Sequence, residues 1–330
     1  MVKRLLGEGY KVLALDIKPM EDWYQVHEEV MNQGLFDLRD ADNVNQIFKS
    51  HEFDEVYQFA ADMGGAGYIF TGEHDADVMH NSATINLNVA HAVAKYSPKT
   101  KCFYSSSACI YPEHNQTDPE NPNCEESSAY PANPDSEYGW EKLFSERMWR
   151  SFARNYGLEV RIARFHNIFG PYGTWDGGKE KAPAAMCRKA LQAGPPVTMT
   201  GTMLDEIRYP KGLGRLEVWG PGTQTRSFLY IDECIEAVRR LMESDVTDVI
   251  NIGSDEMISI NDLAEMALDI AGINAKVVNV DGPVGVMGRC SDNRLIAEKL
   301  GWAPSEPLLE GMKKTMRWIE KEFLASYNKP

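Results

Sequence analysis

The segment KCFYSSSACIYP at residues 101–112 determines the fold class of this 330-residue chain. Its first half has the length and the apolar composition of a buried strand, and it runs directly into three serines. Similar apolar blocks lie at 12–16, 55–60 and 159–165, separated by segments of helical periodicity at about 41–50, 76–96 and 136–156. This alternation predicts an α/β fold with a doubly wound parallel sheet that is covered by helices.

Polar or small residues follow each predicted strand. They are Asp16, Ala61 with Asp62, Ser106 with Ser107, and His166 with Asn167. In doubly wound sheets, ligands bind just beyond the carboxyl ends of the strands. We therefore expect the functional site among these loops.

The composition of the chain changes after residue 166. Gly- and Pro-rich stretches at 170–178 and 194–222 separate shorter predicted elements there. This pattern predicts a first domain at 1–166 and a smaller second domain made of 167–224 and 256–330. Elements at about 225–255, including 227–231, helical 232–244 and 249–252, are expected to return to the main sheet. The two domains would then be interleaved in sequence.

Composition excludes several classes of protein. Forty-nine acidic against 34 basic side chains give a net charge of −15, which disfavours nucleic-acid and anionic-membrane partners. No apolar run approaches the about 18 residues of a membrane span, and no signal peptide is recognisable. The six cysteines form no Cys/His cluster with zinc-ligand spacing, so we expect reduced thiols, a cytoplasmic location and no metal.

Tyr138 and Lys142 stand four residues apart in the helix predicted at 136–156. Both side chains then project from one face, where the ammonium can lower the pKa of the phenol. The pair alone is a weak signal. Its position strengthens it, because Ser105, Ser106 and Ser107 end a strand about thirty residues upstream in the same predicted sheet.

A strand ending in serine, then Tyr-x-x-x-Lys, with Asp16 ending an early strand, resembles the extended short-chain dehydrogenase/reductase family, whose cofactor domain is a Rossmann fold. Within that family the chain is most similar to the GDP-mannose 3,5-epimerases. Five blocks in order carry this resemblance: AADMGG at 60–65, SSACIYP at 106–112, RFHNIFGP at 164–171, GGKEKAP at 177–183 and QTRSF at 224–228.

The resemblance implies an NAD-dependent reaction on a GDP-hexose. Tyr138 would take the C4 hydroxyl proton as the hydride leaves C4, and Lys142 would assist it. Ser107 would hydrogen-bond the reacting hydroxyl. Cys109 would act as the base and Lys181 as the acid that invert C3 and C5. If 107–109 is extended, Cys109 points to the same side as Ser107, and its thiol needs nearby positive charge to ionise.

The resemblance also implies binding residues and an assembly. The expected cofactor contacts, besides Tyr138 and Lys142, are Asp16, Asp37, Ala60 and Ala61. The expected substrate contacts are Gly67, Asn167, Glu180, Lys189, Gln224, Arg226 and Arg289, of which Lys189, Arg226 and Arg289 would bind the diphosphate. The glycines near 64–67 would let the backbone approach the hexose. The helices near 76–96 and 136–156 would form a homodimer.

Alternatives and departures remain. Dehydratases of this fold carry Asp-Glu where this chain has Ala108-Cys109, so dehydration is disfavoured. Another nucleotide-sugar epimerase or reductase, or a catalytically silent sugar-nucleotide-binding relative, stays open as an alternative. Residues 195–217 are longer than the connection in the family and lie beside the expected nucleotide pocket.

The largest departure is at the start of the chain. The family opens with a strand and a glycine-rich turn at a helix N-terminus, and neither is recognisable here. Met1–Leu6 is expected to be the end of the following helix. The strands at 11–16 and 55–60 would then face each other across an unfilled central position, so Met1 is expected to be an internal methionine of a longer protein, or the chain a fragment.

Overall fold

A four-stranded parallel sheet lies at the centre of the computed structural model, which describes residues 1–194 and 214–327. The strands follow the order β10–β5–β4–β3. Their bounds are β3 (Glu55–Gln58), β4 (Lys101–Ser107), β5 (Val160–Phe165) and β10 (Ile250–Ile252). The strands predicted at 55–60, 101–105, 159–165 and 249–252 are confirmed, and with them the α/β fold class.

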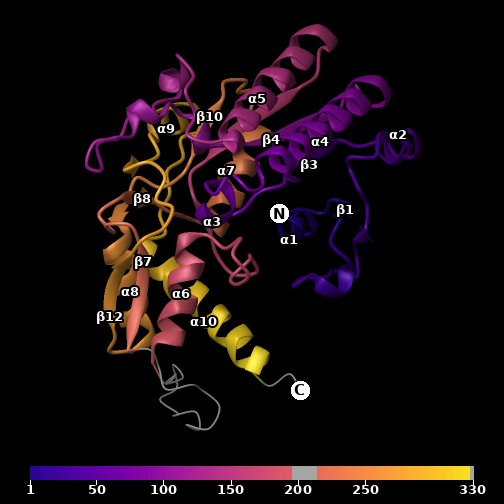
Figure 1. Cartoon of the computed structure of the whole chain (residues 1–330). Helices are drawn as coiled ribbons and strands as arrows, with labels where there is room; N and C mark the ends of the chain where they lie inside the picture. The colour runs from indigo at the N-terminus through magenta and orange to yellow at the C-terminus, as the bar shows by residue number, and fades with distance from the viewer. Residues whose placement is uncertain (195–213, 328–330) are drawn as a thin grey trace.

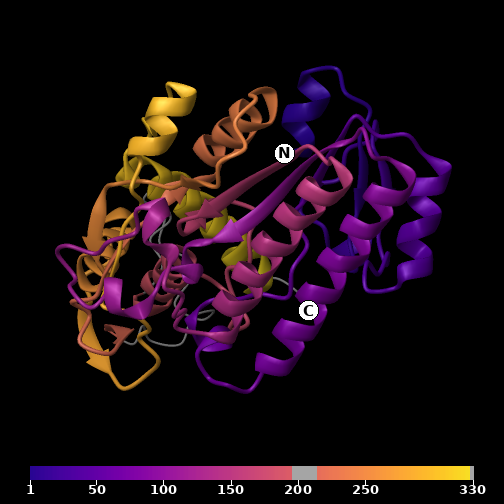
Figure 2. The ribbon, with the colours of Figure 1, turned by 90° about the horizontal axis from the view of Figure 1, so that it is seen from above.

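Helices cover both faces of this sheet (Figures 1 and 2). One face carries α4 (Asp75–Tyr96) and α5 (Glu137–Tyr156), with α2 (Ala41–Ser50) packed on α4, and the other carries α7 (Ile231–Glu243) and α9 (Arg294–Leu300). Residues of β4 alternate between the two cores, since Tyr104 packs with α4 and α5 while Phe103 packs with α7. The helices predicted at 41–50, 76–96 and 136–156 are confirmed.

Local sequence explains where the long helix α5 begins and ends. The side chain of Ser136 accepts a hydrogen bond from the Gly139 N–H and caps the first turn. Gly157, with a φ of +71°, ends the helix in the left-handed conformation that favours glycine. These two signals fix the position of Tyr138 and Lys142 relative to the sheet.

The N-terminal segment forms a unit of its own beside the main sheet. It contains the helix α1 (Val2–Gly7) and two parallel strands, β1 (Leu13–Leu15) and β2 (Met31–Gln33). The helix end at Met1–Leu6 and the strand at 12–16 were predicted, whereas β2 was not. In the part of the chain that the structure describes, β1 pairs only with β2 and β3 only with β4, so β1 and β3 belong to different sheets. The buried Arg239 of α7 ties the two regions through ion pairs of 2.8 Å with Glu8 and Glu55.

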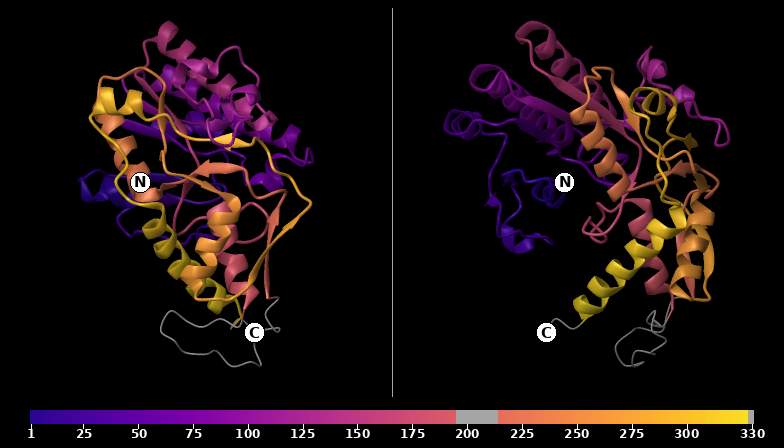
Figure 3. Two further views of the ribbon diagram at one scale, coloured as in Figure 1. Left: turned by 90° about the vertical axis from the view of Figure 1, so that its left-hand side faces the viewer. Right: turned by 180° about the vertical axis from the view of Figure 1, so that it is seen from behind.

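A second layer packs around its own core (Figure 3). It is formed by α6 (Ala182–Ala193), α8 (Ile260–Ala271), α10 (Leu308–Tyr327) and the parallel strands β7 (Arg215–Trp219) and β12 (Lys276–Val280). Its centre contains Leu191, Leu216, Leu263 and Met316, all almost fully buried. Of the long segment noted at 195–217, residues 195–213 lie outside the described residues.

Short strands connect the two layers. They are β6 (Ile168–Phe169) with β9 (Leu229–Tyr230), and β8 (Thr225–Ser227) between β11 (Met257–Ser259) and β13 (Gly288–Arg289); the short helix α3 (Ala66–Ile69) follows β3. The prediction that 227–231 returns to the main sheet is wrong, although 249–252 does return. Phe228 and Tyr230 are buried in the second-layer core while Leu229 packs into the main-sheet core, so the segment lies between the two layers and pairs with neither β10 nor β5. No described helix is both long and apolar enough to cross a membrane.

Candidate active site

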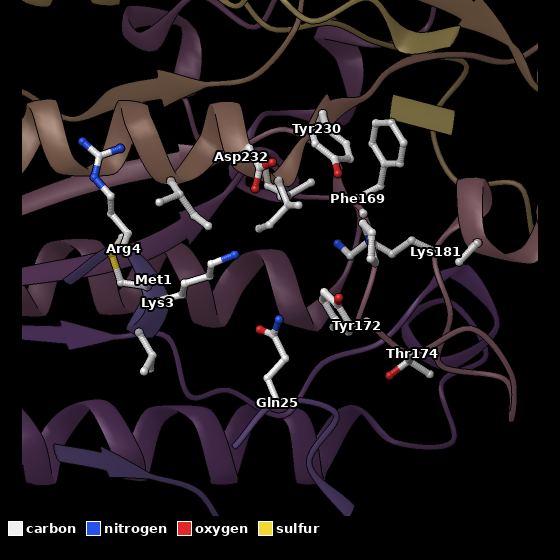
Figure 4. A pocket seen from close by; sticks show the side chains of 18 of the residues that line it. Met1, Lys3, Arg4, Gln25, Phe169, Tyr172, Thr174, Lys181, Tyr230 and Asp232 are labelled. Carbon is white, nitrogen blue, oxygen red and sulfur yellow. The ribbon is translucent and has the colours of Figure 1, made fainter. Parts of the chain in front are cut away.

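Two adjoining cavities open at the carboxyl ends of the main-sheet strands. The larger has a volume of about 1130 Å³ and lies between α1, the loop after β6 and the start of α7. Figure 4 shows Lys3 and Lys181 reaching into it from opposite sides. The smaller cavity, of about 460 Å³, shares Gly64 and Lys181 with the larger one. Both exceed the lower end of the about 300–1,000 Å³ typical of ligand sites.

The smaller cavity brings together most of the site predicted from sequence. Its lining includes the predicted catalytic residues Ser107, Cys109, Tyr138 and Lys181 and the predicted substrate contacts Gly67, Asn167, Glu180, Lys189, Gln224, Arg226 and Arg289. These residues come from segments between positions 67 and 289, so only folding makes them neighbours. Lys142 is buried behind them on α5.

Ser107 and Cys109 lie at the end of β4, but not in an extended segment. Residues 108–110 form a turn of 3₁₀ helix, which Ser107 caps by accepting a hydrogen bond of 3.2 Å from the Cys109 N–H. The prediction of an extended 107–109 is therefore wrong, because the serine side chain bends the chain as soon as the strand ends. Both side chains still line the same cavity. Gly139 permits this packing, since a Cβ there would lie 2.2 Å from the Cys109 carbonyl oxygen.

Tyr138 and Lys142 share one face of α5, as predicted. The Lys142 ammonium lies 5.7 Å from the Tyr138 ring centre and donates a 2.8 Å hydrogen bond to the Ser105 carbonyl. Burial raises the pKa of Tyr138, although a hydrogen bond with Ser107 opposes the shift. Burial also lowers the pKa of Lys142. Burial thus outweighs any lowering of the phenol pKa by the neighbouring ammonium, because desolvation penalises the charged form of the phenol.

Lys181 occupies the N-cap position of α6, as expected for a loop residue at a helix start. Its side chain borders both cavities, and burial lowers the pKa of its ammonium. The loop before it is held by the segment after β3, where the Gly65 N–H donates a 3.0 Å hydrogen bond to the Lys179 carbonyl. A Cβ at Gly65 would lie 2.1 Å from the Glu180 carbonyl oxygen, so glycine is required for this approach.

The predicted substrate contacts give the smaller cavity a cationic wall. Lys189 donates to the Glu217 carbonyl at 2.8 Å and lies 5.3 Å from the Trp219 ring centre. Arg226 donates to three backbone carbonyls, and burial lowers the pKa of its guanidinium to about 10. Glu180 forms a 2.7 Å ion pair with Arg188. Lysine and arginine around an enclosed space suit a phosphorylated ligand.

Two amide side chains have distinct surroundings. Asn167 adopts a left-handed φ of +46°, which asparagine tolerates better than most residues, and donates a 2.9 Å hydrogen bond to the Ser227 carbonyl. Gln224 donates to the Trp219 carbonyl at 3.1 Å. Its buried Oε1 finds no hydrogen-bond partner within residues 1–194 and 214–327. A buried acceptor without a partner is costly, so a ligand donor is favoured at this point.

The predicted cofactor contacts outside α5 do not line either cavity. Asp16 follows β1, is exposed and accepts a 2.8 Å hydrogen bond from the Lys18 N–H. Asp37 is engaged by Arg39, whose guanidinium holds the pKa of that carboxyl below its usual value. Ala60 and Ala61 follow β3, and the Ala60 N–H donates to Gln58.

Sequence reasoning missed residues that border or support the site. Trp219 lines the smaller cavity and packs within 3.0 Å of the Cβ position of Gly67. Gln116 and Asp135 bind the guanidinium of Arg289, which in turn contacts Cys109. Trp219 could have been found from its place at the end of an apolar block beside Gly-Pro-Gly. Gln116 and Asp135 carry no motif of their own.

The sequence is similar to that of known epimerases. The model of the NAD dependent epimerase/dehydratase family matches residues 1–253. GDP-mannose 3,5-epimerase of Arabidopsis thaliana is 43% identical over 324 residues, covering 98% of this chain and 79% of that protein.

Solved structures show the same fold at low sequence identity. UDP-glucose 4-epimerase of Thermotoga maritima has a TM-score of 0.79 at 23% identity and covers 98% of this chain and 94% of its own. UDP-glucose 4-epimerase of Thermus thermophilus, in a complex with NAD, has a TM-score of 0.77 at 21% identity and covers 97% and 94%. These two likenesses concern the fold.

Proposed function

The chain belongs to the NAD dependent epimerase/dehydratase family, and from this premise we propose that it inverts C3 and C5 of the hexose in GDP-mannose. Epimerisation of a nucleotide sugar with NAD is the activity of the enzyme. One observation carries the finer assignment: Cys109 and Lys181 line the same cavity as Ser107 and Tyr138. A simple 4-epimerase needs no second acid and base, so this pair would be surplus in one.

The cavities suit the two ligands that such a reaction requires. NAD fits the larger one, which opens at the carboxyl ends of the strands and adjoins the smaller one at Gly64 and Lys181. When bound, NAD supplies a reversible hydride acceptor for C4. Tyr138 borders the adjoining smaller cavity and, with Lys142 behind it on α5, would hold the nicotinamide end. Asp16 lies outside both cavity linings, at the end of β1, and its contact with the adenosine ribose hydroxyls is proposed from the family resemblance alone. Cavity volume and strand-end position support this fit.

The protein side chains supply the proton transfers. Tyr138, in its phenolate form, accepts the C4 hydroxyl proton while Ser107 holds that oxygen. Because the C4 carbonyl acidifies the hydrogens at C3 and C5, Cys109 as a thiolate can remove a proton from one face of the sugar, and Lys181 as an ammonium can deliver one to the other. The lowered pKa of Lys181 supports this role, since an acid works best near the operating pH.

The nucleotide would occupy the cationic wall of the smaller cavity. Lys189, Arg226 and Arg289 all line this cavity and would share the negative charge of a diphosphate, and the unpartnered Gln224 Oε1 favours a donor on the base. The relative at 43% identity is named for GDP-mannose, which supports guanine as that base.

A substrate panel tests the assignment. We expect GDP-mannose to be converted with inversion at C3 and C5, and UDP- and dTDP-hexoses to react at least tenfold more slowly at equal concentration. Product sugars are identified by chromatography and proton NMR after release from the nucleotide. Faster conversion of a UDP-hexose, or inversion confined to C4, would contradict the proposal and favour another epimerase of the fold.

We also propose that the chain divides into a cofactor domain, residues 1–166 with returning elements at about 225–255, and a substrate domain, 167–224 with 256–330. Separate cores support this division, because the main sheet and the second layer each bury their own apolar cluster. The two domains interleave further than these ranges state. The helix α9 falls within 256–330, but its Ile296 is buried against β10 of the main sheet.

A homodimer is proposed from the outer surface of α4 and α5. These helices pack side by side and expose Leu87, Trp140 and Phe144, with relative exposures of 41–48%. Large apolar side chains gathered on adjacent helices are typical of an interface. Light scattering should give the mass of two chains, and Phe144→Glu should reduce it to one, while Leu309→Glu on α10 leaves it unchanged. A wild-type mass of one chain would contradict the dimer.

We place the enzyme in the cytoplasm. All six cysteines are free, and four of them are buried. Reduced thiols in this number are expected where the redox environment keeps them reduced.

A further inference from the structure

The thiol of Cys109 lies against one buried cation. Arg289 of β13 is 4% exposed, and its Nη1 lies 3.1 Å from the Cys109 sulfur. A guanidinium is always charged and can only donate, so the sulfur must be the acceptor in this contact. A charged donor of this kind favours the thiolate over the neutral thiol. The contact thus meets the requirement for positive charge beside a cysteine that acts as a base.

The guanidinium is fixed from its other two nitrogens. Its Nε donates to Gln116 Oε1 at 2.6 Å, and its Nη2 donates to Asp135 Oδ2 at 3.1 Å. Gln116 is itself held, because its Nε2 donates to the carbonyls of Tyr111 and Pro112 at 3.0 and 3.2 Å. Gln116 and Asp135 are buried on either side of the arginine. Its position beside the sulfur is therefore determined by two separate contacts, one with Gln116 and one with Asp135.

Other ionisable groups also face Cys109. They are Tyr138 and Lys142 of α5, Lys181 before α6, Arg226 of β8 and Cys124 in the loop after β4. Among the described residues, none of these groups forms a hydrogen bond to the sulfur, whereas Arg289 does. Burial lowers the pKa of Arg289, but the charges of Cys109 and Asp135 outweigh burial and raise it.

We propose that Arg289 holds Cys109 in the thiolate form required of the base, and that Gln116 and Asp135 are positioning residues that fix the guanidinium against the sulfur. The proposal rests on the role proposed above for Cys109. It gives Arg289 a function in proton transfer that is separate from diphosphate binding. Three of the five N–H groups of the guanidinium are used in these contacts, which leaves others free for a ligand.

The pH dependence of Cys109 alkylation tests the proposal without any substrate. The full chain with NAD is treated with iodoacetamide, and modification of the Cys109 peptide is followed by mass spectrometry. We expect Arg289→Met to lower the alkylation rate at neutral pH about tenfold and to move the half-maximal rate about one pH unit upward. Arg289→Lys, which keeps the charge, should recover part of the rate. Arg294→Gln, at an exposed arginine nearby, should leave the profile unchanged.

Asp135→Asn separates positioning from simple electrostatics. Removal of a carboxylate near a thiolate by itself favours the thiolate and would move the profile downward. Loss of the guanidinium position moves it upward, and we expect this second result. Thermal melting and retained NAD binding show that each variant is folded.

An unchanged profile in Arg289→Met and Arg289→Lys would overturn the role of Arg289, and a downward or absent shift in Asp135→Asn would overturn the role of Asp135. Because no sugar takes part, these outcomes are independent of the substrate panel. If the Arg289 and Asp135 variants shift the alkylation profile as expected but the wild type does not turn over GDP-mannose, the proposed function is refuted. The proposal about Arg289 then stands.

Discussion

Cys109→Ala is expected to abolish inversion at C3 and C5 while C4 oxidation continues. The substitution removes the sulfur that takes the proton, and leaves Tyr138 and Lys142 in place on α5. Loss of a positioned acid or base costs about 10²–10⁴-fold in rate. In deuterated water the wild-type enzyme should carry deuterium into C3 and C5 and none into C4. The variant should lose both labels and still show the ultraviolet absorbance of reduced cofactor.

One comparison variant and one control variant accompany Cys109→Ala. Lys181→Ala should also stop inversion, because it removes the partner on the opposite face of the sugar, yet exchange at C3 and C5 through Cys109 should persist. Cys290→Ala is the control, since Cys290 is not part of either cavity lining. Full inversion by Cys109→Ala would remove this residue from the mechanism. Deuterium at C4 in the wild type would show that the hydride is not retained in the site.

The main sheet could be predicted because its strands bury both faces. A strand such as 101–107 reads as an apolar run, and the helices between the strands carry caps such as Ser136 and Gly157 that the sequence displays. The short strands could not be predicted in this way. β6, β8, β9 and β13 each contain two or three residues, and their partners are set by which core takes Phe228 and Tyr230.

The candidate site was likewise only partly predictable from the sequence. Residues carried by motifs, such as Ser107, Tyr138 and Lys181, were found and are brought to one cavity. Their local geometry could not be predicted, because the serine cap that bends 108–110 depends on a single side-chain hydrogen bond. Charge effects were also missed. The balance between burial and neighbouring charge on Tyr138 depends on solvent exclusion by the whole fold, which sequence spacing does not contain.

Tyr138→Phe is expected to stop the reaction one step earlier than Cys109→Ala. The ring packs with Ile69 and Val78, so phenylalanine should keep the fold while losing only the hydroxyl. Without that hydroxyl the C4 proton has no acceptor, so C4 is not oxidised and the hydrogens at C3 and C5 are not acidified. We expect the turnover rate to fall about 10²–10⁴-fold. Neither deuterium exchange nor reduced-cofactor absorbance should be seen.

The absence of reduced-cofactor absorbance distinguishes this variant from Cys109→Ala, because Tyr138 acts before the C4 carbonyl has formed and Cys109 acts after it. Lys142→Ala should give the same pattern, since its ammonium lies 5.7 Å from the phenol ring centre and supports the same step. Tyr130→Phe removes an exposed phenol hydroxyl elsewhere and should leave turnover unchanged. Exchange at C3 or C5 in Tyr138→Phe would mean that C4 is oxidised without this phenol. Tyr138 would then be a packing residue, and the proton acceptor would have to be sought among the other groups of the cavity.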